Sequence, residues 1–329
     1  MEHFSKLKLK GLGIGWFVPS ILCMVILAYY FPKPGIIKEP ISLSELSSFG
    51  IFLIFFFYGA KLNFEKLRIG LNNWHLHLLI QITTFLIFPL LILSIKPFFL
   101  NEQLINIWLG LFFLSALPST VSSSVVMVSL AGGNIPSAIF NASISAFIGI
   151  LVTPLWIGLF FSNNGVRLEL TSIIIKLTLQ VILPVLVGML LHKRLNTFVE
   201  KHKKSLQVFD QTIILLIIYN SFCKSFSEKL FSNMTLLEVM VLALGMLFLF
   251  VLIVLFSKFS STVLKFNRAD TITTIFCASK KSLVHGSVMA GILFAGNPIV
   301  GWIILPLMFY HAIQLIVSSF LAKRMSRIE

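Results

Sequence analysis

The sequence predicts an all-α polytopic membrane protein: ten transmembrane helices in two inverted five-helix repeats, with discontinuous helices four and nine crossing at mid-membrane. Three observations lead to this fold class. Of the 329 residues, 57% are hydrophobic and 12% are charged, far from the composition of soluble domains. Ten apolar stretches approach or exceed the length of about 20 residues that crosses a bilayer. Polar residues interrupt two of these stretches, one in each half of the chain.

The ten predicted spans divide evenly between the two halves of the chain. They cover residues 11–30, 46–60, 74–95, 103–130 and 135–161, and then 171–191, 211–222, 235–256, 271–295 and 298–321. With the N-terminus in the cytoplasm, 17 lysines and arginines fall on the cytoplasmic side and 6 on the other. The positive-inside rule then predicts a multi-pass protein of the inner (cell) membrane with both termini cytoplasmic.

The same distribution explains the formal charge of +14. Because the basic surplus reflects topology, we do not expect nucleic acid as a partner. Membrane lipid surrounds the chain in this interpretation, and the sequence leaves open whether it is a monomer or a homo-oligomer. The three cysteines have no pairing or metal-binding spacing.

The two halves resemble each other at a nearly constant offset. Pro19 and Pro184 are 165 positions apart, Lys61 and Lys224 are 163 apart, and Gly133-Asn134 matches Gly296-Asn297, also 163 apart. Five spans per half would make the second copy enter the membrane from the opposite side, which is an inverted-topology repeat. We therefore expect two units, residues 1–165 and 166–329.

The fourth span is interrupted at Pro118. Residues 116–125 place this proline and five hydroxyl side chains inside an apolar segment, and among the hydroxyls are Ser119 and Thr120. A kinked packing helix with back-bonded hydroxyls would account for the proline alone. A second break in the other half favours a discontinuous helix, whose freed backbone groups build substrate and ion sites in secondary transporters.

The second break lies at the mirror position of the first. Lys281 follows Pro118 by 163 residues and sits in Phe276-Cys-Ala-Ser-Lys-Lys-Ser-Leu283, beside Lys280 and Ser282. None of the twelve acidic residues lies in the middle of a span. The amine of Lys281 is therefore a counter-charge for an anion, a neutral amine that takes up a proton, or a built-in replacement for a metal ion. Adjacent helical residues point about 100° apart, so at most one lysine faces the crossing point directly, and the alternative is that both extend to cytoplasmic water along the first half of span nine.

Other polar residues of the spans are weaker candidates. Gln81 and Thr84 are spaced to present oxygens to one cavity, or to form interhelical hydrogen bonds. His311 relays protons or packs with a hydrogen bond. His77 is interpreted as a residue of the membrane interface. The sequence contains no Ser/His/Asp set, metal-ligand cluster or nucleotide loop, so we do not expect an enzyme or a bound cofactor.

With these motifs in view, nearly the whole chain resembles the bile acid:sodium symporter family, solute carrier family 10. The segment Phe276–Leu283 is similar to a Phe-Cys-x-x-x-Lys-Ser-Leu element of a divergent bacterial subgroup. A second element, Pro-Leu-x-x-Tyr-His-x-x-Gln-Leu, begins at Pro306 and includes His311 and Gln314. The resemblance implies a core domain that holds the crossed helices and a panel domain against which it moves.

The resemblance also implies a sodium site, carried over position by position. Its ligands would be Ser123, Ser124, Ser137 and Asn141, which bear the oxygens that a hard cation prefers. The family's glutamate falls on Cys277 and its glutamine on Lys281. An ammonium group repels sodium, so the coupling ion, Na⁺ or H⁺, stays open.

The sequence thus predicts a secondary transporter that moves a small organic anion by alternating access. The first alternative is a proton-linked or sodium/proton exchanger. The second is a membrane regulatory protein that keeps the fold without transporting a solute.

Overall fold

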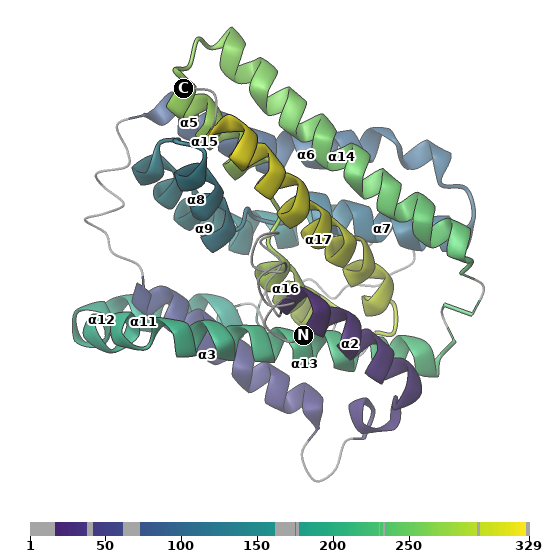
Figure 1. Cartoon of the computed structure of the whole chain (residues 1–329). Coiled ribbons are helices and arrows are strands. Elements are labelled where there is room, and N and C mark those ends of the chain that lie inside the picture. Colours follow the sequence, from purple (N-terminus) through teal and green to yellow (C-terminus); the bar gives the residue numbers. More distant parts are fainter. Residues whose placement is uncertain are drawn as a thin grey trace, which may run out of the picture.

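The computed structural model describes residues 17–37, 42–61, 73–161, 175, 178–229, 231–232, 234–294 and 297–326, and the regular elements within these ranges are helices (Figure 1). The expected beginnings of spans one and six, at Gly11 and Thr171, lie outside the described residues.

In the first half, the helices follow the predicted order closely. They are α2 (Phe17–Tyr30), the 3₁₀ turn η1 (Lys33–Gly35), α3 (Leu43–Lys61), α5 (Trp74–Ile82), the π-helix η2 (Thr83–Ile87), α6 (Phe88–Ser94), the 3₁₀ turn η3 (Lys96–Phe98), α7 (Glu102–Ala116), α8 (Ser122–Leu130) and α9 (Ile135–Phe161). α5, η2 and α6 form one continuous rod of 25 residues together with η3.

The second half begins with a π-helix and ends with the long C-terminal helix. Its elements are η5 (Thr178–Ile182), α11 (Leu183–Leu190), α12 (His192–Lys201), α13 (Lys203–Ser227), α14 (Leu236–Val263), α15 (Arg268–Ala278), α16 (Leu283–Leu293) and α17 (Val300–Met325). α14 starts with a capping box, in which Thr235 and Glu238 satisfy each other's backbone N–H groups.

Six of the described helices are long and apolar enough to cross a membrane, and a seventh span results if η5–α11 and α12, which bend by 96°, are taken together. α2 and α7 are shorter apolar helices. The chain is therefore an all-helical, multi-pass membrane protein. The count of ten spans, the inverted repeats and the units 1–165 and 166–329 stay predictions.

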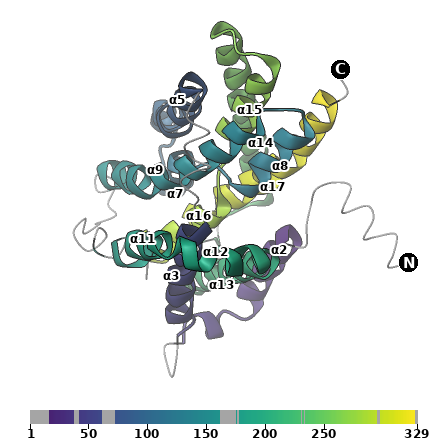
Figure 2. The same cartoon turned by 90° about the vertical axis from the view of Figure 1, so that its left-hand side faces the viewer.

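The helices gather in two groups. Figures 1 and 2 show α2, α3, α11, α12 and α13 together in one layer, which we name the first group, and α5–α9, α14, α15 and α17 in a second group, with α16 between the layers. In the first group, α3 packs along α11 and α13, and α13 packs on α2. α16 contacts α13 of the first group and α17 of the second.

Two glycines bring α3 and α11 into backbone contact. A Cβ atom on Gly59 would strike the backbone oxygen of Val185, and one on Gly188 would strike the backbone oxygen of Phe56. Small residues at such positions let membrane helices approach without intervening side chains.

The segment between spans six and seven differs from the prediction. It is helical rather than a loop, because α12 covers His192–Lys201 and α13 begins at Lys203. Val199 of α12 is buried against Ala60 and Leu206. Leu195 joins the same cluster four positions earlier, so apolar residues at helical spacing form one face of α12, which the mean hydropathy of this polar segment does not indicate.

Candidate functional site

The break in the fourth span separates α7 from α8. α7 ends at Ala116, Leu117 is extended with ψ 153°, and α8 begins at Ser122. Pro118 explains this geometry, because a proline lacks the N–H group and disfavours the helical conformation of the residue before it. The expected discontinuity at Pro118 is therefore present.

The backbone groups at and after the end of α7 are hydrogen-bonded, two of them to side chains of α9. The Leu117 N–H donates to Leu114 O at 3.2 Å. The Thr153 hydroxyl, on α9, donates to Ala116 O at 2.7 Å. The Ser119 N–H donates to Ser145 Oγ at 3.0 Å. A helix end without such partners would leave buried polar groups, each of which costs about 1–3 kcal/mol.

The second break separates α15, which ends at Ala278, from α16, which begins at Leu283. The Ser282 hydroxyl caps α16 by accepting from the His285 N–H at 3.3 Å. The Tyr310 hydroxyl donates to Ser279 O at 2.6 Å. Gln314 pairs with both backbone groups of Lys281, accepting from its N–H and donating to its C=O, each at 2.8 Å. Gln314 also contacts His311 Nδ1 at 3.0 Å.

The two breaks lie directly against each other. The Ser282 N–H donates to Pro118 O at 2.9 Å. The Ser119 hydroxyl donates to Cys277 O at 2.6 Å, and the Ser124 hydroxyl to Phe276 O at 3.2 Å. The meeting of the two discontinuities is thus present as expected, whereas its depth in the membrane stays a prediction.

Lys281 fills the space between the breaks. Its side chain is fully buried, and its Nζ donates to Ser115 O at 2.6 Å, Leu117 O at 2.8 Å and Thr84 O at 2.8 Å. The ammonium group also lies 4.3 Å from the centre of the Phe88 ring. All three N–H groups of the amine therefore have acceptors.

The three acceptors are backbone carbonyls that local geometry sets free. Ser115 lies in the last turn of α7 and Leu117 directly follows the helix, whose C-terminus carries partial negative charge. Thr84 lies in the π-helix η2, where the Phe88 N–H reaches back to Thr83 O. Buried charges in proteins need such pairing, because removing an ammonium group from water costs several kcal/mol.

Lys280 is also fully buried but is held differently. Its Nζ donates to Ser123 O at 2.9 Å and lies 5.6 Å from the centre of the Phe276 ring. Among the described residues this is the one hydrogen bond of the amine. Ser123 itself is partly exposed, whereas Thr84, Ser115 and Leu117 around the Lys281 amine are buried.

The four expected sodium ligands lie in two clusters. In the first, the Ser123 hydroxyl donates to Thr120 Oγ1 at 2.8 Å, and Thr120 Oγ1 lies 2.7 Å from Ser124 Oγ. In the second, Asn141 Nδ2 donates to Ser137 O at 3.0 Å. Within the described ranges no hydrogen bond joins the two clusters, and their role as a joint cation site stays a prediction.

Asn141 connects two further residues. Gln81 Nε2 donates to Asn141 Oδ1 at 3.1 Å, and Asn141 Nδ2 lies 2.7 Å from His77 Nδ1. The Thr84 hydroxyl instead donates to Ile80 O of its own helix at 2.8 Å. Gln81 and Thr84 therefore make separate side-chain contacts. His77, which the sequence places at the membrane interface, has a buried side chain, and its depth in the membrane stays a prediction.

Sequence reasoning also missed an acidic group behind the site. Asp270, in the first turn of α15, is buried. Its carboxylate accepts from Asn73 Nδ2 at 2.7 Å, Asn134 Nδ2 at 2.8 Å and Asn267 Nδ2 at 3.0 Å. These bonds join the starts of α5, α9 and α15. Asn134, which belongs to the repeated Gly-Asn pair, is the sequence signal for this contact.

Apolar helices that bury two touching helix breaks, with charged side chains between them, are typical of secondary transporters. The fold and this site place the protein in the class of multi-pass membrane transporters.

The chain belongs to the SBF-like CPA transporter family, whose sequence profile matches residues 15–327. It is similar to Pseudomonas aeruginosa "Uncharacterized protein PA2026" (36% identical, 94% of this chain and 92% of that protein). It is also similar to Escherichia coli "Putative symporter YfeH" (34% identical, 94% and 92%). "Sodium/bile acid cotransporter 7" of Rattus norvegicus is 32% identical over 93% of this chain and 91% of that protein. Membership in a transporter family agrees with the expectation that the protein is not an enzyme.

Proposed function

We propose that this protein is a secondary transporter of the cell membrane that moves a small organic anion by alternating access, with both termini cytoplasmic. The observation that carries the proposal is the meeting of two helix breaks around two fully buried lysines, Lys280 and Lys281. In the described part of the chain, the one ion pair joins Lys61 to Asp210, so neither buried lysine has an acidic partner there. Relatives named as a symporter and as sodium/bile acid cotransporters support a transported solute.

Lys281 acts in this proposal as a resident cation. Its three N–H groups bind carbonyls from α7 and η2, which leaves none to bind a transported anion. A bound metal ion would use the same carbonyl oxygens, so the ammonium group takes the place of such an ion. Lys280 has one backbone acceptor and lies beside the partly exposed Ser123, and it is the stronger candidate to meet a transported species.

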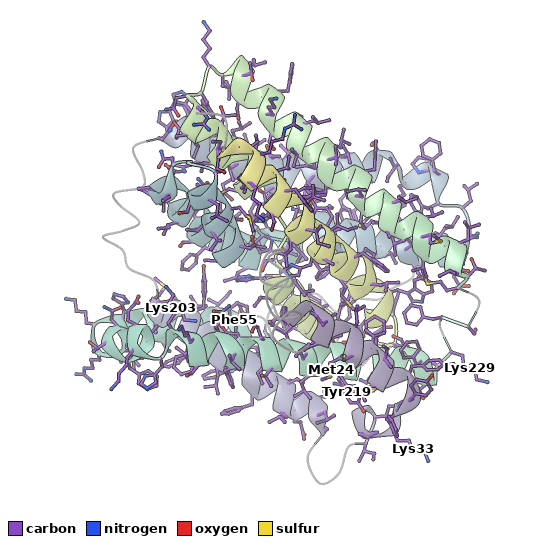
Figure 3. The ribbon with its side chains drawn as sticks, viewed as in Figure 1. Met24, Lys33, Phe55, Lys203, Tyr219 and Lys229 are labelled. Carbon is purple, nitrogen blue, oxygen red and sulfur yellow. The ribbon has the colours of Figure 1, made fainter. Side chains whose placement is uncertain are left out.

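Uptake into vesicles tests the function. Vesicles that contain the purified protein should accumulate labelled taurocholate, the first probe because relatives are named bile acid cotransporters. The Lys281→Ala variant should lose at least tenfold in uptake rate, because the two breaks lose their shared cation. Lys203→Ala removes an exposed lysine at the start of α13 (Figure 3) and should retain uptake.

Two results would contradict this role for Lys281. One is a Lys281→Ala protein whose uptake rate, affinity and ion dependence equal those of the unaltered chain. The other is uptake that Lys203→Ala reduces as strongly as Lys281→Ala does.

A proton-linked exchanger is the second candidate, and one observation favours it. Lys280 Nζ makes a single hydrogen bond within the described residues, to the backbone O of Ser123. A buried amine with one backbone acceptor keeps positions free to gain or lose a proton. An imposed pH gradient, without any organic solute, should then move sodium or protons through the protein. Absence of such flux would reject this candidate, and flux that persists in Lys280→Met would reject the role of Lys280 in it.

A further inference from the structure

Three helices of the second group meet at one end. α14 ends at Val263, and α15 begins at Arg268. The Arg268 guanidinium donates from Nη2 to the backbone oxygen of Met325, the last residue of α17, at 2.6 Å. Figure 1 shows the three helix ends at the same end of the second group, near the C-terminus. The basic residues of the loops predict that this end faces the cytoplasm.

A cavity of about 200 Å³ lies among these helix ends. Its polar lining consists of Lys258 from α14 and of Arg268 and Thr271 from α15. Both basic side chains are exposed, so the cavity opens at the protein surface. The rest of its lining is apolar and consists of Phe266, Ile272, Ile275 and Met325.

One face of α15 gives the cavity its direction. Arg268, Thr271, Ile272 and Ile275 follow the spacing i, i+3, i+4 and i+7, which places them on one face of the helix. This face begins with a charge and becomes apolar over about 10 Å of helix. Both isoleucines are buried. A ligand that fits this face is negatively charged at one end and apolar at the other.

The two basic groups have no counter-charge in the described part of the chain. Neither Lys258 nor Arg268 belongs to an ion pair there, and the lining of the cavity includes no acid. The nearby Asp270 is buried, and its carboxylate accepts from three asparagine amides. Arg268 uses one N–H group for Met325, whereas a guanidinium has five. Its other donors and the Lys258 amine are available to an anion.

The surface beside the cavity is apolar. Leu255 and Phe259, which flank Lys258 on α14, are 57% and 68% exposed. α14 is long and apolar enough to cross a membrane, so such side chains face lipid. From Lys258 to the end of α14 at Val263, the helix rises by about 7.5 Å. In a spanning α14, Lys258 therefore lies where the hydrocarbon gives way to the lipid headgroups.

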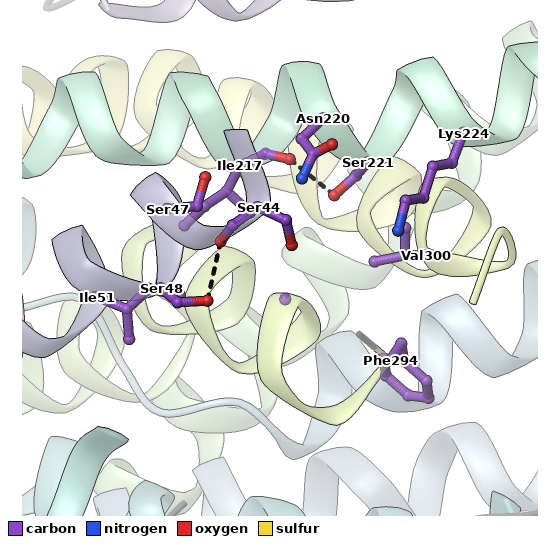
Figure 4. Close-up of a pocket in the computed structure, with 11 residues that line it drawn as sticks. Ser44, Ser47, Ser48, Ile51, Ile217, Asn220, Ser221, Lys224, Phe294 and Val300 are labelled. Atoms are coloured by element: carbon purple, nitrogen blue, oxygen red, sulfur yellow. Dashed lines mark hydrogen bonds between the residues drawn. The ribbon is translucent and has the colours of Figure 1, made fainter. Parts of the chain in front are cut away.

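A second cavity, between the two helix groups, differs in size and lining. Its volume of about 40 Å³ is room for a few water molecules. Figure 4 shows Ser44, Ser47 and Ser48 of α3 beside Asn220 and Lys224 of α13 in its lining. The cavity at the start of α15 is about five times as large. Of the two, it is the one that accommodates a phosphate group together with part of an acyl chain.

We propose that the cavity among α14, α15 and α17 binds an anionic phospholipid of the cytoplasmic leaflet. The lipid phosphate contacts Lys258 and Arg268, and one acyl chain lies along Ile272 and Ile275. Basic pockets between membrane helices on the cytoplasmic side are typical headgroup sites, because anionic lipids give this leaflet a negative surface potential. The bound lipid joins α14 and α17 to α15, the helix that ends at the second break.

Native mass spectrometry of the purified full chain in a neutral detergent measures the binding. Dioleoyl phosphatidylglycerol should bind as one tightly held lipid, and dioleoyl phosphatidylcholine, which has the same chains without net charge, should bind more weakly. Lys258→Gln should weaken phosphatidylglycerol binding about fivefold, which corresponds to about 1 kcal/mol for one basic residue near a membrane surface. This variant keeps the hydrogen bond between Arg268 and Met325.

The matched control is Lys203→Gln. Lys203 is an exposed lysine at the start of α13, in a segment that the topology also predicts to be cytoplasmic, and it does not line the cavity. The control variant removes the same charge and should bind phosphatidylglycerol as the unaltered chain does. Equal weakening by both substitutions would show attraction to the overall basic charge and would overturn the site.

A second variant fills the cavity without removing a charge. Thr271→Phe places a ring between the basic groups and the isoleucines, so it should abolish the tightly held phosphatidylglycerol. Thr271→Val has nearly the size of threonine and should retain it. Thermal unfolding without lipid shows that each variant is folded. Retention of the lipid by Thr271→Phe would contradict the placement of the acyl chain.

A third measurement distinguishes a lipid from a free anion. Phosphatidylglycerol should raise the midpoint of thermal unfolding, since a ligand of the folded state stabilises it. Potassium phosphate should raise it no more than potassium chloride of equal ionic strength does. Stabilisation by inorganic phosphate that Lys258→Gln removes would replace the lipid site by a site for free anions. Equal affinity for phosphatidylglycerol and phosphatidylcholine, or full affinity in Lys258→Gln, would also overturn the proposal.

Discussion

The two helix breaks meet in space but differ in what they offer. The α7–α8 break, created by Pro118, presents carbonyl oxygens and receives donors from Thr153, Lys281 and Ser282. The α15–α16 break provides two of those donors, the Lys281 amine and the Ser282 N–H. Its own backbone is held by Gln314 and Tyr310 of α17. Breaks at mirror positions of a sequence are therefore chemically complementary rather than equivalent.

The strongest way to break this complementarity is to remove the group that both breaks share. Lys281→Ala should lower the free energy of unfolding by about 3 kcal/mol or more, because three buried carbonyls lose their donor. Lys280→Ala removes a single backbone contact and should cost less. Thermal unfolding of the purified proteins in detergent measures both. If Lys280→Ala proves the more harmful substitution, the assignment of Lys281 as the shared cation is wrong.

A smaller effect is expected from a change confined to the second break. Gln314→Ala should cost about 2 kcal/mol, since the Lys281 N–H and C=O each lose a buried hydrogen bond. Gln103→Ala is the control, because Gln103 makes one side-chain contact, with Glu238. Denaturant unfolding compares the two. Equal losses would show that the backbone of the second break does not depend on Gln314.

The smallest effect is expected at the first break. Thr153→Val removes the donor to Ala116 O and should cost about 1 kcal/mol, because the other carbonyls keep their partners. Thr212→Val is the matched control, since Thr212 is exposed and bonds only within its own helix at Val208 O. A loss at Thr153 as large as that of Lys281→Ala would contradict the view that the first break is satisfied by independent donors.

The positions of the breaks could be predicted from the sequence, but their partners could not. Pro118 and the adjacent lysines are local signals. A proline or a charged residue is unfavourable inside an apolar membrane helix, and a short stretch of sequence is enough to show it. The acceptors around the Lys281 amine, in contrast, are backbone carbonyl oxygens. Thr84 O belongs to it because η2 is a π-helix, and a main-chain acceptor leaves no trace in residue identity.

The burial of His77 and of Asp270 was also not predictable, because it depends on neighbouring helices. His77 was assigned to the interface from its distance to the predicted start of span three. In the structure α5 and α9 lie together, and His77 reaches Asn141. Asp270 directly precedes predicted span nine and carries no local signal of burial, yet three asparagine amides surround it. Position along a helix predicts depth, whereas burial also depends on which neighbour covers that face.

The contact of α3 with α11 at Gly59 and Gly188 has a mechanical consequence. Interlocked backbones have no side-chain layer that could rearrange between them, so α3 and α11 are expected to move as one rigid unit in the proposed alternating access. Gly59 and Gly188 lie near the Lys61 end of α3, so a displacement of that end would carry both helices with it.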